Sequence, residues 1–287
     1  MNFQALIRCH NDLGEGPIWD TREGALFWLD INQAKIQRYD PRSKDVKVFD
    51  MPMRVTALGL RQRGGFVAVT EKGFHFWDGK STALEFISHP EEGKAEARFN
   101  DGKVDRAGCF WAGTMDARNA TSALYRLDAD LSVRRMEEGI TISNGIGWSP
   151  DNRKMYYADS LRYAVYEFSF DLKTGMINER KVFLQVEPEF GVPDGLTVDS
   201  QGYVWIAFYD GWKVVRYTPN GKEDARVALP VARPTCPAFG GGELDQLYVT
   251  TAIDGLLEKE LEQQPLAGNL FVVEAGVKGL AEPMFEG

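Results

Sequence analysis

Cysteine and histidine are scarce in this sequence, and their scarcity excludes several kinds of site. The three cysteines, Cys9, Cys109 and Cys236, are odd in number and lack zinc-ligand spacing, so we expect reduced thiols and a cytoplasmic location. The three histidines lack zinc-ligand spacing as well. The chain has no Gly-x-Ser-x-Gly elbow, P-loop or EF-hand loop, so the signatures of serine hydrolases, P-loop proteins and EF-hand sites are missing.

Positive charge and long apolar runs are also lacking. Lys and Arg number 33 against 42 Asp and Glu, a formal net charge of −9, so we expect neither nucleic acid nor an anionic membrane as a partner. No apolar run is long enough to cross a bilayer. Residues 1–10 lack the basic start and apolar centre of a signal peptide.

What the sequence does contain is one motif repeated from end to end. Its clearest copy, Pro193 to Ala207, reads as an acidic residue and glycine, an apolar strand, a polar turn and a second apolar strand. The in-phase residues of successive copies are spaced by 42 to 50 positions: Glu15, Ala57, Asp101, Asn144, Asp194 and Pro237. A period of this length, with four short strands per unit, is typical of a propeller blade.

The repeat predicts an all-β fold, a six-bladed β-propeller with four-stranded blades around a central channel, in which residues 1–287 form one domain. One more step beyond Pro237 falls too close to the last residue to allow a seventh blade. Phe3 to Cys9 reads as a strand that completes the last blade, which we expect to end near Met284 and Phe285. The only helix-like stretch is Leu256 to Gln264.

The in-phase position of the repeat also predicts a site. Equivalent points of propeller blades face the same height of the channel, so Glu15, Asn144 and Asp194 are expected to converge there, with Asn100 and Asp101 beside them. Like charges repel unless neutralised, and an all-oxygen cluster suits a divalent metal ion. The alternative is that Asp-Gly and Asn-Gly pairs simply form turns.

The same residues resemble a known family over nearly the whole chain. The motifs that carry the resemblance are Leu13 to Pro17, Arg98 to Lys103, Gly113 to Met115, Ser143 to Gly145, Pro193 to Leu196 and Phe239 to Gly241. With them the chain resembles the senescence marker protein/gluconolactonase family, which includes regucalcin and bacterial sugar lactonases. The resemblance implies a six-bladed propeller with one catalytic divalent metal ion and a small sugar lactone as substrate.

The resemblance also implies individual roles. The metal ligands carry over onto Glu15, Asn144 and Asp194, and the substrate contacts onto Arg98 and Asn100, with Asp101 beside them. Asp194 is the expected catalytic base. Asp101 is the alternative base, because a carboxylate held by a cation has a lowered pKa and is a weak base. Without the resemblance, Arg98 is expected to form a surface ion pair with one of the glutamates at positions 91, 92 and 96.

One departure from the family concerns the substrate. Where the family has an acidic substrate contact shortly after Gly-Thr-Met, ungapped counting places Arg118. An arginine facing the pocket predicts a substrate with a carboxylate or sulfonate, such as an aldaric or uronic acid lactone rather than a neutral aldonolactone.

Two other functions are compatible with the same residues. One is a calcium-binding propeller without catalysis, and the other is a different hydrolase, phosphotriesterase-like, on the same metal site. A lactonase is favoured because the Arg98, Asn100 and Asp101 cluster accompanies the metal residues. Oxygen ligands admit calcium, manganese, magnesium or ferrous iron, and zinc with lower preference. The sequence gives no indication of oligomeric state.

Overall fold

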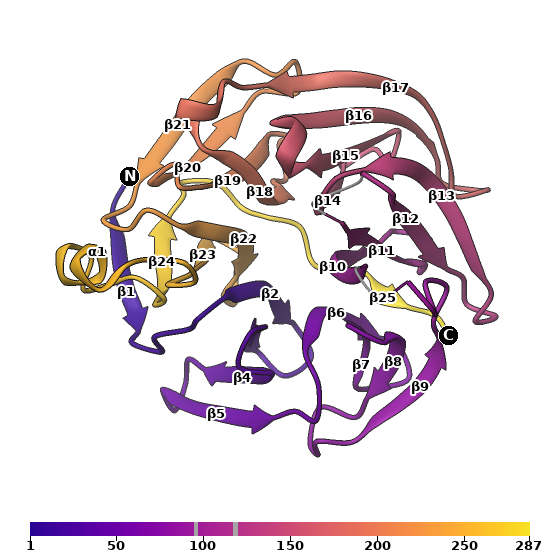
Figure 1. Cartoon of the computed structure of the whole chain (residues 1–287), viewed down its shortest axis with the longest axis horizontal. Helices are drawn as coiled ribbons and strands as arrows, with labels where there is room; N and C mark the ends of the chain where they lie inside the picture. Colours follow the sequence, from indigo (N-terminus) through magenta and orange to yellow (C-terminus); the bar gives the residue numbers. More distant parts are fainter. Residues whose placement is uncertain (95–96, 117–119) are drawn as a thin grey trace.

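Six antiparallel sheets form a ring in the computed structural model, which describes residues 1–94, 97–116 and 120–287. Figure 1 shows the ring from one end, with the sheets arranged as blades around its centre. The predicted six-bladed β-propeller is therefore confirmed. In the described ranges no helix is both long enough and apolar enough to span a membrane.

The first three blades each follow the chain from the inner strand to the outer strand. Blade one contains β2 (Gly14–Asp20), β3 (Ala25–Asp30), β4 (Lys35–Asp40) and β5 (Asp45–Asp50). Blade two contains β6 (Val55–Arg61), β7 (Phe66–Thr70), β8 (Gly73–Trp77) and β9 (Leu84–Ser88). Blade three contains β10 (Arg98–Val104), β11 (Phe110–Met115), β12 (Ser122–Leu127) and β13 (Val133–Ile140).

Blades four and five repeat this order, and blade six borrows a strand from the N-terminus. Blade four contains β14 (Ser143–Trp148), β15 (Lys154–Asp159), β16 (Ala164–Asp171) and β17 (Met176–Gln185). Blade five contains β18 (Val192–Val198), β19 (Val204–Tyr209), β20 (Lys213–Tyr217) and β21 (Glu223–Ala228). Blade six contains β22 (Pro234–Gly240), β23 (Gln246–Thr251), β24 (Leu270–Glu274) and β1 (Phe3–Ile7).

Within the described residues, three short helical segments lie in the connections. The α-helix α1 (Glu258–Gln263) falls within the stretch that the sequence predicts to be helical, and η1 (Ser160–Arg162) and η2 (Pro188–Phe190) are single 3-10 turns.

The hydrophobic core lies between the blades. Each blade packs a buried face against the next one, which gives one cluster at each of the six junctions in the described part of the chain. Between blades one and two, for example, the rings of Phe27 and Phe66 meet edge to face at 4.8 Å between centroids. Strands such as β3 and β7 are buried on both faces, which explains their continuous apolar sequences. The outermost strand β5 is largely exposed.

The two chain ends lie on different blades. The N-terminal strand β1 pairs antiparallel with β24, so the predicted completion of the last blade is confirmed. The prediction that this blade ends near Met284 and Phe285 is wrong, because these residues form β25 (Met284–Phe285), which pairs in parallel with β6 of blade two. Figure 1 shows the C-terminal segment, in yellow, crossing near the centre of the ring to reach that blade.

Candidate active site

Every inner strand carries the same irregularity near its start. In each one, a single extra residue shifts the register against the second strand of the blade. In blades four and five the shift begins directly after Ser143 and Pro193, so Asn144 and Asp194 are the first residues of the bulge. A bulge re-aims the side chains next to it, and bulges are common beside active sites. Six bulges in phase therefore present side chains at one end of the inner strands.

The register corrects the predicted phase in blades two, three and six, and in blade one it places the start of the bulge at Gly16, one residue after Glu15. In blade three the last regular pair is Phe99 with Thr114, so Asn100, rather than Asp101, occupies the position of Asn144 and Asp194. By the same criterion Thr56 replaces Ala57 in blade two, and Thr235 replaces Pro237 in blade six.

The sequence contains a signal that would have given the right phase. Glu15, Asn100 and Asp194 each precede a fully buried aspartate by five residues: Asp20, Asp105 and Asp199. Asp101 precedes Asp105 by only four residues. The motif is better aligned on these aspartates than on its glycines.

The glycines that follow Asn144 and Asp194 allow neighbouring strands to approach. Asn144–Gly145 and Asp194–Gly195 lie within strands β14 and β18, so the alternative that these pairs form turns is wrong. A Cβ on Gly145 would lie 2.6 Å from the carbonyl oxygen of Asp194, and one on Gly195 would lie 2.4 Å from Sγ of Cys236. A side chain at either position would push two inner strands apart.

The polar side chains at this end of the channel share one orientation. Glu15 Oε2 accepts a hydrogen bond from the N–H of the next residue at 2.9 Å, Asp101 Oδ1 does so at 2.8 Å, and Asn144 Oδ1 does so at 3.1 Å. Asp194 is likewise bonded by the amide of Gly195. Each side chain is thus held by its own backbone.

Hydrogen bonds between blades fix these residues further. Arg98 Nη1 donates to Asn100 Oδ1 at 3.0 Å, and Asn100 Nδ2 donates to the carbonyl of Ser143 at 2.8 Å, which joins blade three to blade four.

A second set joins blade four to blade five. Asn144 Nδ2 donates to Ser160 Oγ at 3.1 Å, and Ser160 Oγ donates to the carbonyl of Pro193 at 2.8 Å, next to Asp194. Because Ser160 engages the amide nitrogen of Asn144, the amide oxygen with its second lone pair is the group left to bind a ligand.

Three acidic groups share this end of the channel. Burial raises the pKa of Glu15 well above its ordinary value, and the charges of Asp194 and Asp101 raise it further. Burial, and then the charge of Asp101, likewise raises the pKa of Asp194 well above its usual range. Burial also raises the pKa of Asp101 to about 6. The structure thus brings the three predicted carboxyl groups within electrostatic reach of one another.

These carboxyl groups fit a divalent cation. Across the described ranges, none of the three forms an ion pair, although Asp194 is buried and Glu15 and Asp101 are partly buried, so their charges are withdrawn from water without an ion-pair partner. No three His, Cys, Asp or Glu side chains of those ranges are gathered closely enough to hold a metal by themselves. The predicted ligand set differs from such a cluster because it combines two carboxylates, Glu15 and Asp194, with the amide oxygen of Asn144. This is an all-oxygen donor set.

Among the described residues, Arg98 forms no surface ion pair with Glu91 or Glu92, two of the partners that the sequence alone suggests. It lies partly buried at the start of β10, and Glu91 instead pairs with Lys94 at 2.5 Å and accepts a hydrogen bond from the hydroxyl of Tyr125. Glu92 is not paired with Arg98 either, within the part of the chain that is described. Positions 96 and 118 lie outside the described residues, so the prediction for Arg118 stays a prediction.

Several residues at the site were missed by sequence reasoning. Cys236 follows the in-phase Thr235, and burial raises the pKa of its thiol well above the ordinary value, with Asp101 and Glu15 adding to the shift. Lys103 forms an ion pair with Glu282 at 3.0 Å, and both residues line a hollow of about 30 Å³ together with Asp101 and Cys236. Correct phasing would have pointed to the start of β22, but no repeat predicts Glu282.

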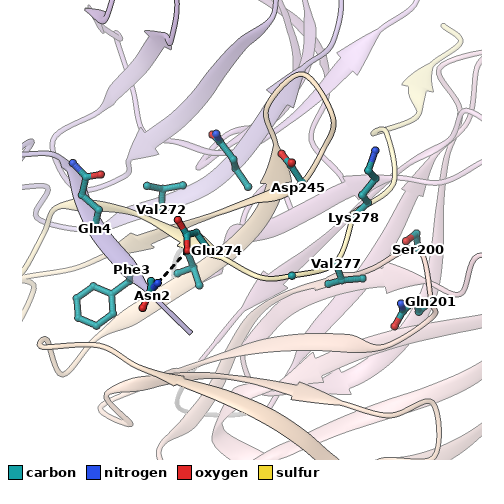
Figure 2. A pocket seen from close by; sticks show the side chains of 13 residues that line it. Asn2, Phe3, Gln4, Ser200, Gln201, Asp245, Val272, Glu274, Val277 and Lys278 are labelled. Atoms are coloured by element: carbon teal, nitrogen blue, oxygen red, sulfur yellow. Dashed lines mark hydrogen bonds between the residues drawn. The ribbon is translucent and has the colours of Figure 1, made fainter.

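A larger hollow lies elsewhere on the molecule. It measures about 990 Å³ and lies against β1 and β24, beside the Ser200–Gln201 turn and residues 276–278. Figure 2 shows that its labelled charged side chains, Asp245, Glu274 and Lys278, are dispersed around it, with Asn2 hydrogen-bonded to Glu274 at 3.2 Å. None of the predicted site residues lines this hollow, so its size alone does not make it the active site.

Known proteins are similar to this chain over most of its length. A family model described as the SMP-30/Gluconolactonase/LRE-like region matches residues 13–253. Regucalcin from Gallus gallus is 39% identical over 284 residues, which make up 96% of this chain and 95% of that protein.

Two solved structures are similar over nearly their whole length. A calcium-binding protein, regucalcin, from Agrobacterium tumefaciens gives a TM-score of 0.94 with 28% identity, covering 98% of this chain and 96% of that one. A luciferin-regenerating enzyme gives a TM-score of 0.92 with 32% identity and covers 99% of both chains.

Proposed function

Because the chain belongs to the SMP-30/gluconolactonase/LRE-like family, we propose that it hydrolyses a sugar lactone to the free sugar acid with the help of one divalent metal ion. The observation that carries this proposal is the convergence of Glu15, Asn144 and Asp194 from three different blades. The carboxyl groups of Glu15, which is partly buried, and Asp194, which is buried, have no ion-pair partner in the described residues, and Arg98 and Asn100 lie beside them.

Glu15, Asn144 and Asp194 would hold the metal ion. When bound, such an ion polarises a lactone carbonyl and stabilises the negative charge that develops on its oxygen. The three protein ligands are oriented by their own backbone amides and by Ser160, so little reorganisation is needed on binding. Oxygen donors are compatible with calcium, manganese, magnesium, ferrous iron or zinc.

Arg98 and Asn100 would position the substrate. Arg98 uses Nη1 to bond Phe99 and Asn100 at 2.9 and 3.0 Å, which leaves its other N–H groups for hydroxyl or carboxylate oxygens of the sugar. Holding the lactone ring in a fixed orientation lowers the entropic part of the barrier to attack by water.

The base accepts the proton of the attacking water. The water oxygen bonds to the carbonyl carbon, the ring carbon–oxygen bond breaks, and the ring oxygen takes up a proton to become a hydroxyl group. We propose Asp194 as the base. Asp101 is the alternative, because burial raises its pKa to about 6 and a base is most effective when its pKa is near the working pH.

The test follows acid release from a panel of neutral and acidic sugar lactones. Chelator-treated protein is compared with protein resupplied with single metals and with spontaneous ring opening in the absence of protein. Turnover that returns only with metal is expected. If no lactone is turned over with any metal, the lactonase proposal is wrong.

A second candidate is a calcium-binding propeller without catalysis, and the name of the relative from Agrobacterium tumefaciens favours it. Such a propeller would use the same metal ligands, but it would give a different result in the same experiment. Calcium would raise the melting temperature of the chelated protein, as any ligand of the folded state does, while no lactone is consumed.

A further inference from the structure

Arg54 occupies the same place in blade two that Arg98 occupies in blade three. Each lies two residues before the bulge residue of its inner strand, Thr56 in β6 and Asn100 in β10. The two strands are neighbours in the ring, and their blades share a buried cluster. Two guanidinium groups are therefore presented at the same end of adjacent inner strands. This is the end of the channel where Glu15, Asp101 and Asp194 lie.

Both guanidinium groups keep free hydrogen-bond donors. Arg98 forms no ion pair within the described ranges, and only its Nη1 donates a hydrogen bond. The nearest carboxylate to Arg54 belongs to Glu71, at 3.9 Å from Nε, which is too long for a hydrogen bond.

Arg233 provides an internal contrast. It lies two residues before Thr235 in blade six, so it is in phase with both arginines. Its Nε is 2.7 Å from Asp210, and another of its nitrogens donates to the carbonyl of Asp254. The guanidinium of Arg233 is thus closely paired, whereas those of Arg54 and Arg98 are not.

Arg54 and Arg98 act on each other electrostatically. Burial and then the charge of Arg54 lower the pKa of Arg98, against the opposite effects of Glu15, Glu71 and Asp254, to about 10. An anion that accepts hydrogen bonds from both guanidinium groups would reduce the repulsion between them.

We propose that Arg54 and Arg98 form a subsite for a carboxylate of the substrate, so that the preferred lactone derives from a sugar diacid rather than from a neutral aldonic acid. This inference rests on the proposed lactonase function. A carboxylate accepts the parallel N–H groups of a guanidinium in pairs, with charge assistance. A hydroxyl group at the same place carries no charge and offers only one oxygen to the two guanidinium groups, which is the basis of discrimination.

The experiment compares two lactones of one ring size and stereochemistry, the five-membered-ring lactones of D-glucaric and D-gluconic acid. They differ only in a terminal carboxylate against a hydroxymethyl group. Wild-type protein is expected to prefer the diacid lactone. Arg54→Gln should lower kcat/KM for the diacid lactone by roughly tenfold or more, mainly through KM, and change the neutral lactone by less than about threefold. Arg54→Lys should retain part of the preference.

Arg63→Gln is the matched control. Arg63 is an exposed arginine in the β6–β7 hairpin, at the opposite end of β6 from Arg54, and it has no ion pair in the described part of the chain. This variant should behave as wild type with both lactones. Equal melting temperatures of the variants would show that all are folded.

The outcomes separate this inference from the proposed function. If Arg54→Gln affects both lactones equally, or neither, the carboxylate subsite is wrong while the lactonase function stands. If wild-type protein hydrolyses neither lactone with any metal, the lactonase function is wrong, and calorimetric binding of glucarate and gluconate tests the subsite alone. Tighter binding of the diacid, lost in Arg54→Gln, would support the subsite, and equal affinities would overturn it.

Discussion

At the scale of single residues, the carboxyl groups of the site lower the stability of the folded protein when no metal ion is bound. Glu15, Asp101 and Asp194 each have a raised pKa, and burial is the largest cause for each. Keeping these groups ionised without a cation costs free energy, whereas a metal ion converts the same charges into binding energy. Functional sites commonly trade stability for activity in this way.

Asp194→Asn tests this effect directly, because the amide keeps the shape of the side chain and removes its charge. We expect lactone turnover to fall by about a hundredfold or more, since a base and a metal ligand are both lost. We expect the melting temperature of the metal-free protein to rise and the stabilisation by metal to shrink. Initial rates and thermal unfolding with and without metal provide the measurement. Asp45→Asn, at an exposed aspartate of β5, should change neither quantity.

A fall in the metal-free melting temperature of Asp194→Asn would contradict this account. It would mean that the charge of Asp194 stabilises the fold, for example through its bond with Asn144.

The pH dependence of stability follows from the same groups. The pKa of Asp101 is about 6 in the folded chain against 3.8 ordinarily, so the folded state holds this proton more tightly than the unfolded state. That stabilisation is complete below pH 3.8 and is lost as the pH rises through about 6. The free energy of unfolding of the chelated protein should therefore be lower at pH 7 than at pH 5, by about 1 kcal/mol from Asp101 alone.

Glu15 and Asp194 should extend this loss to higher pH, because their pKa values are also raised. Urea unfolding at both pH values measures the difference, and Asp101→Asn should reduce it. Stability of the chelated protein that increases from pH 5 to pH 7 would be inconsistent with buried, unpaired carboxylates.

At the scale of the element, the bulge and the glycine that follows it set the positions of the ligands. Gly195 lies where β18 meets β22, and Asp194 precedes it. The strand can carry a ligand at this point only because the next residue has no side chain. The same glycine therefore allows the inner strands to pack closely and sets the position of the Asp194 carboxylate.

Gly195→Ala should consequently disturb both stability and metal binding. The new Cβ would lie 2.4 to 2.7 Å from three atoms of Cys236, so a strand must move, at a cost of about 1 to 3 kcal/mol. Gly242→Ala is the matched control, because nothing lies within 4 Å of a Cβ built there. Urea unfolding and a metal titration monitored by melting temperature give the two readouts. If Gly195→Ala is as stable as Gly242→Ala, the close approach is not what requires glycine.

The blades were predictable from the sequence, and the phase within them was only partly so. Alternating apolar strands and a regular period are local features, so six blades follow from composition and spacing. The hydrogen-bonded register depends on two strands at once and cannot be read from one strand. This is why Asp101 was taken as the in-phase residue of blade three in place of Asn100. The match between Arg54 and Arg98 does not depend on this error, because each also lies three residues before the residue first placed in phase, Ala57 or Asp101.

At the scale of the whole molecule, both chain ends close the ring. The strand β1 covers the edge of β24, which would otherwise expose unpaired backbone groups. The C-terminal segment leaves blade six and reaches blade two, where the amide of Gln62 donates to the carbonyl of Phe285 at 2.9 Å. On the way, Glu282 pairs with Lys103 near the channel. No repeat predicts this path, because the segment has no counterpart in the other blades.

The C-terminal segment should therefore contribute to global stability, and Phe285 is the residue that tests it. Its side chain is fully buried, close to the ring of Phe76 at 6.2 Å between centroids. Phe285→Ala should lower the free energy of unfolding by about 3 to 5 kcal/mol, the usual cost of emptying an aromatic site. Phe86→Ala serves as control in the same blade, because that ring is 61% exposed. Chemical denaturation measures the free energy of unfolding of both variants. A small loss of equal size in both would mean that the C-terminal segment lies against the blades without stabilising the fold.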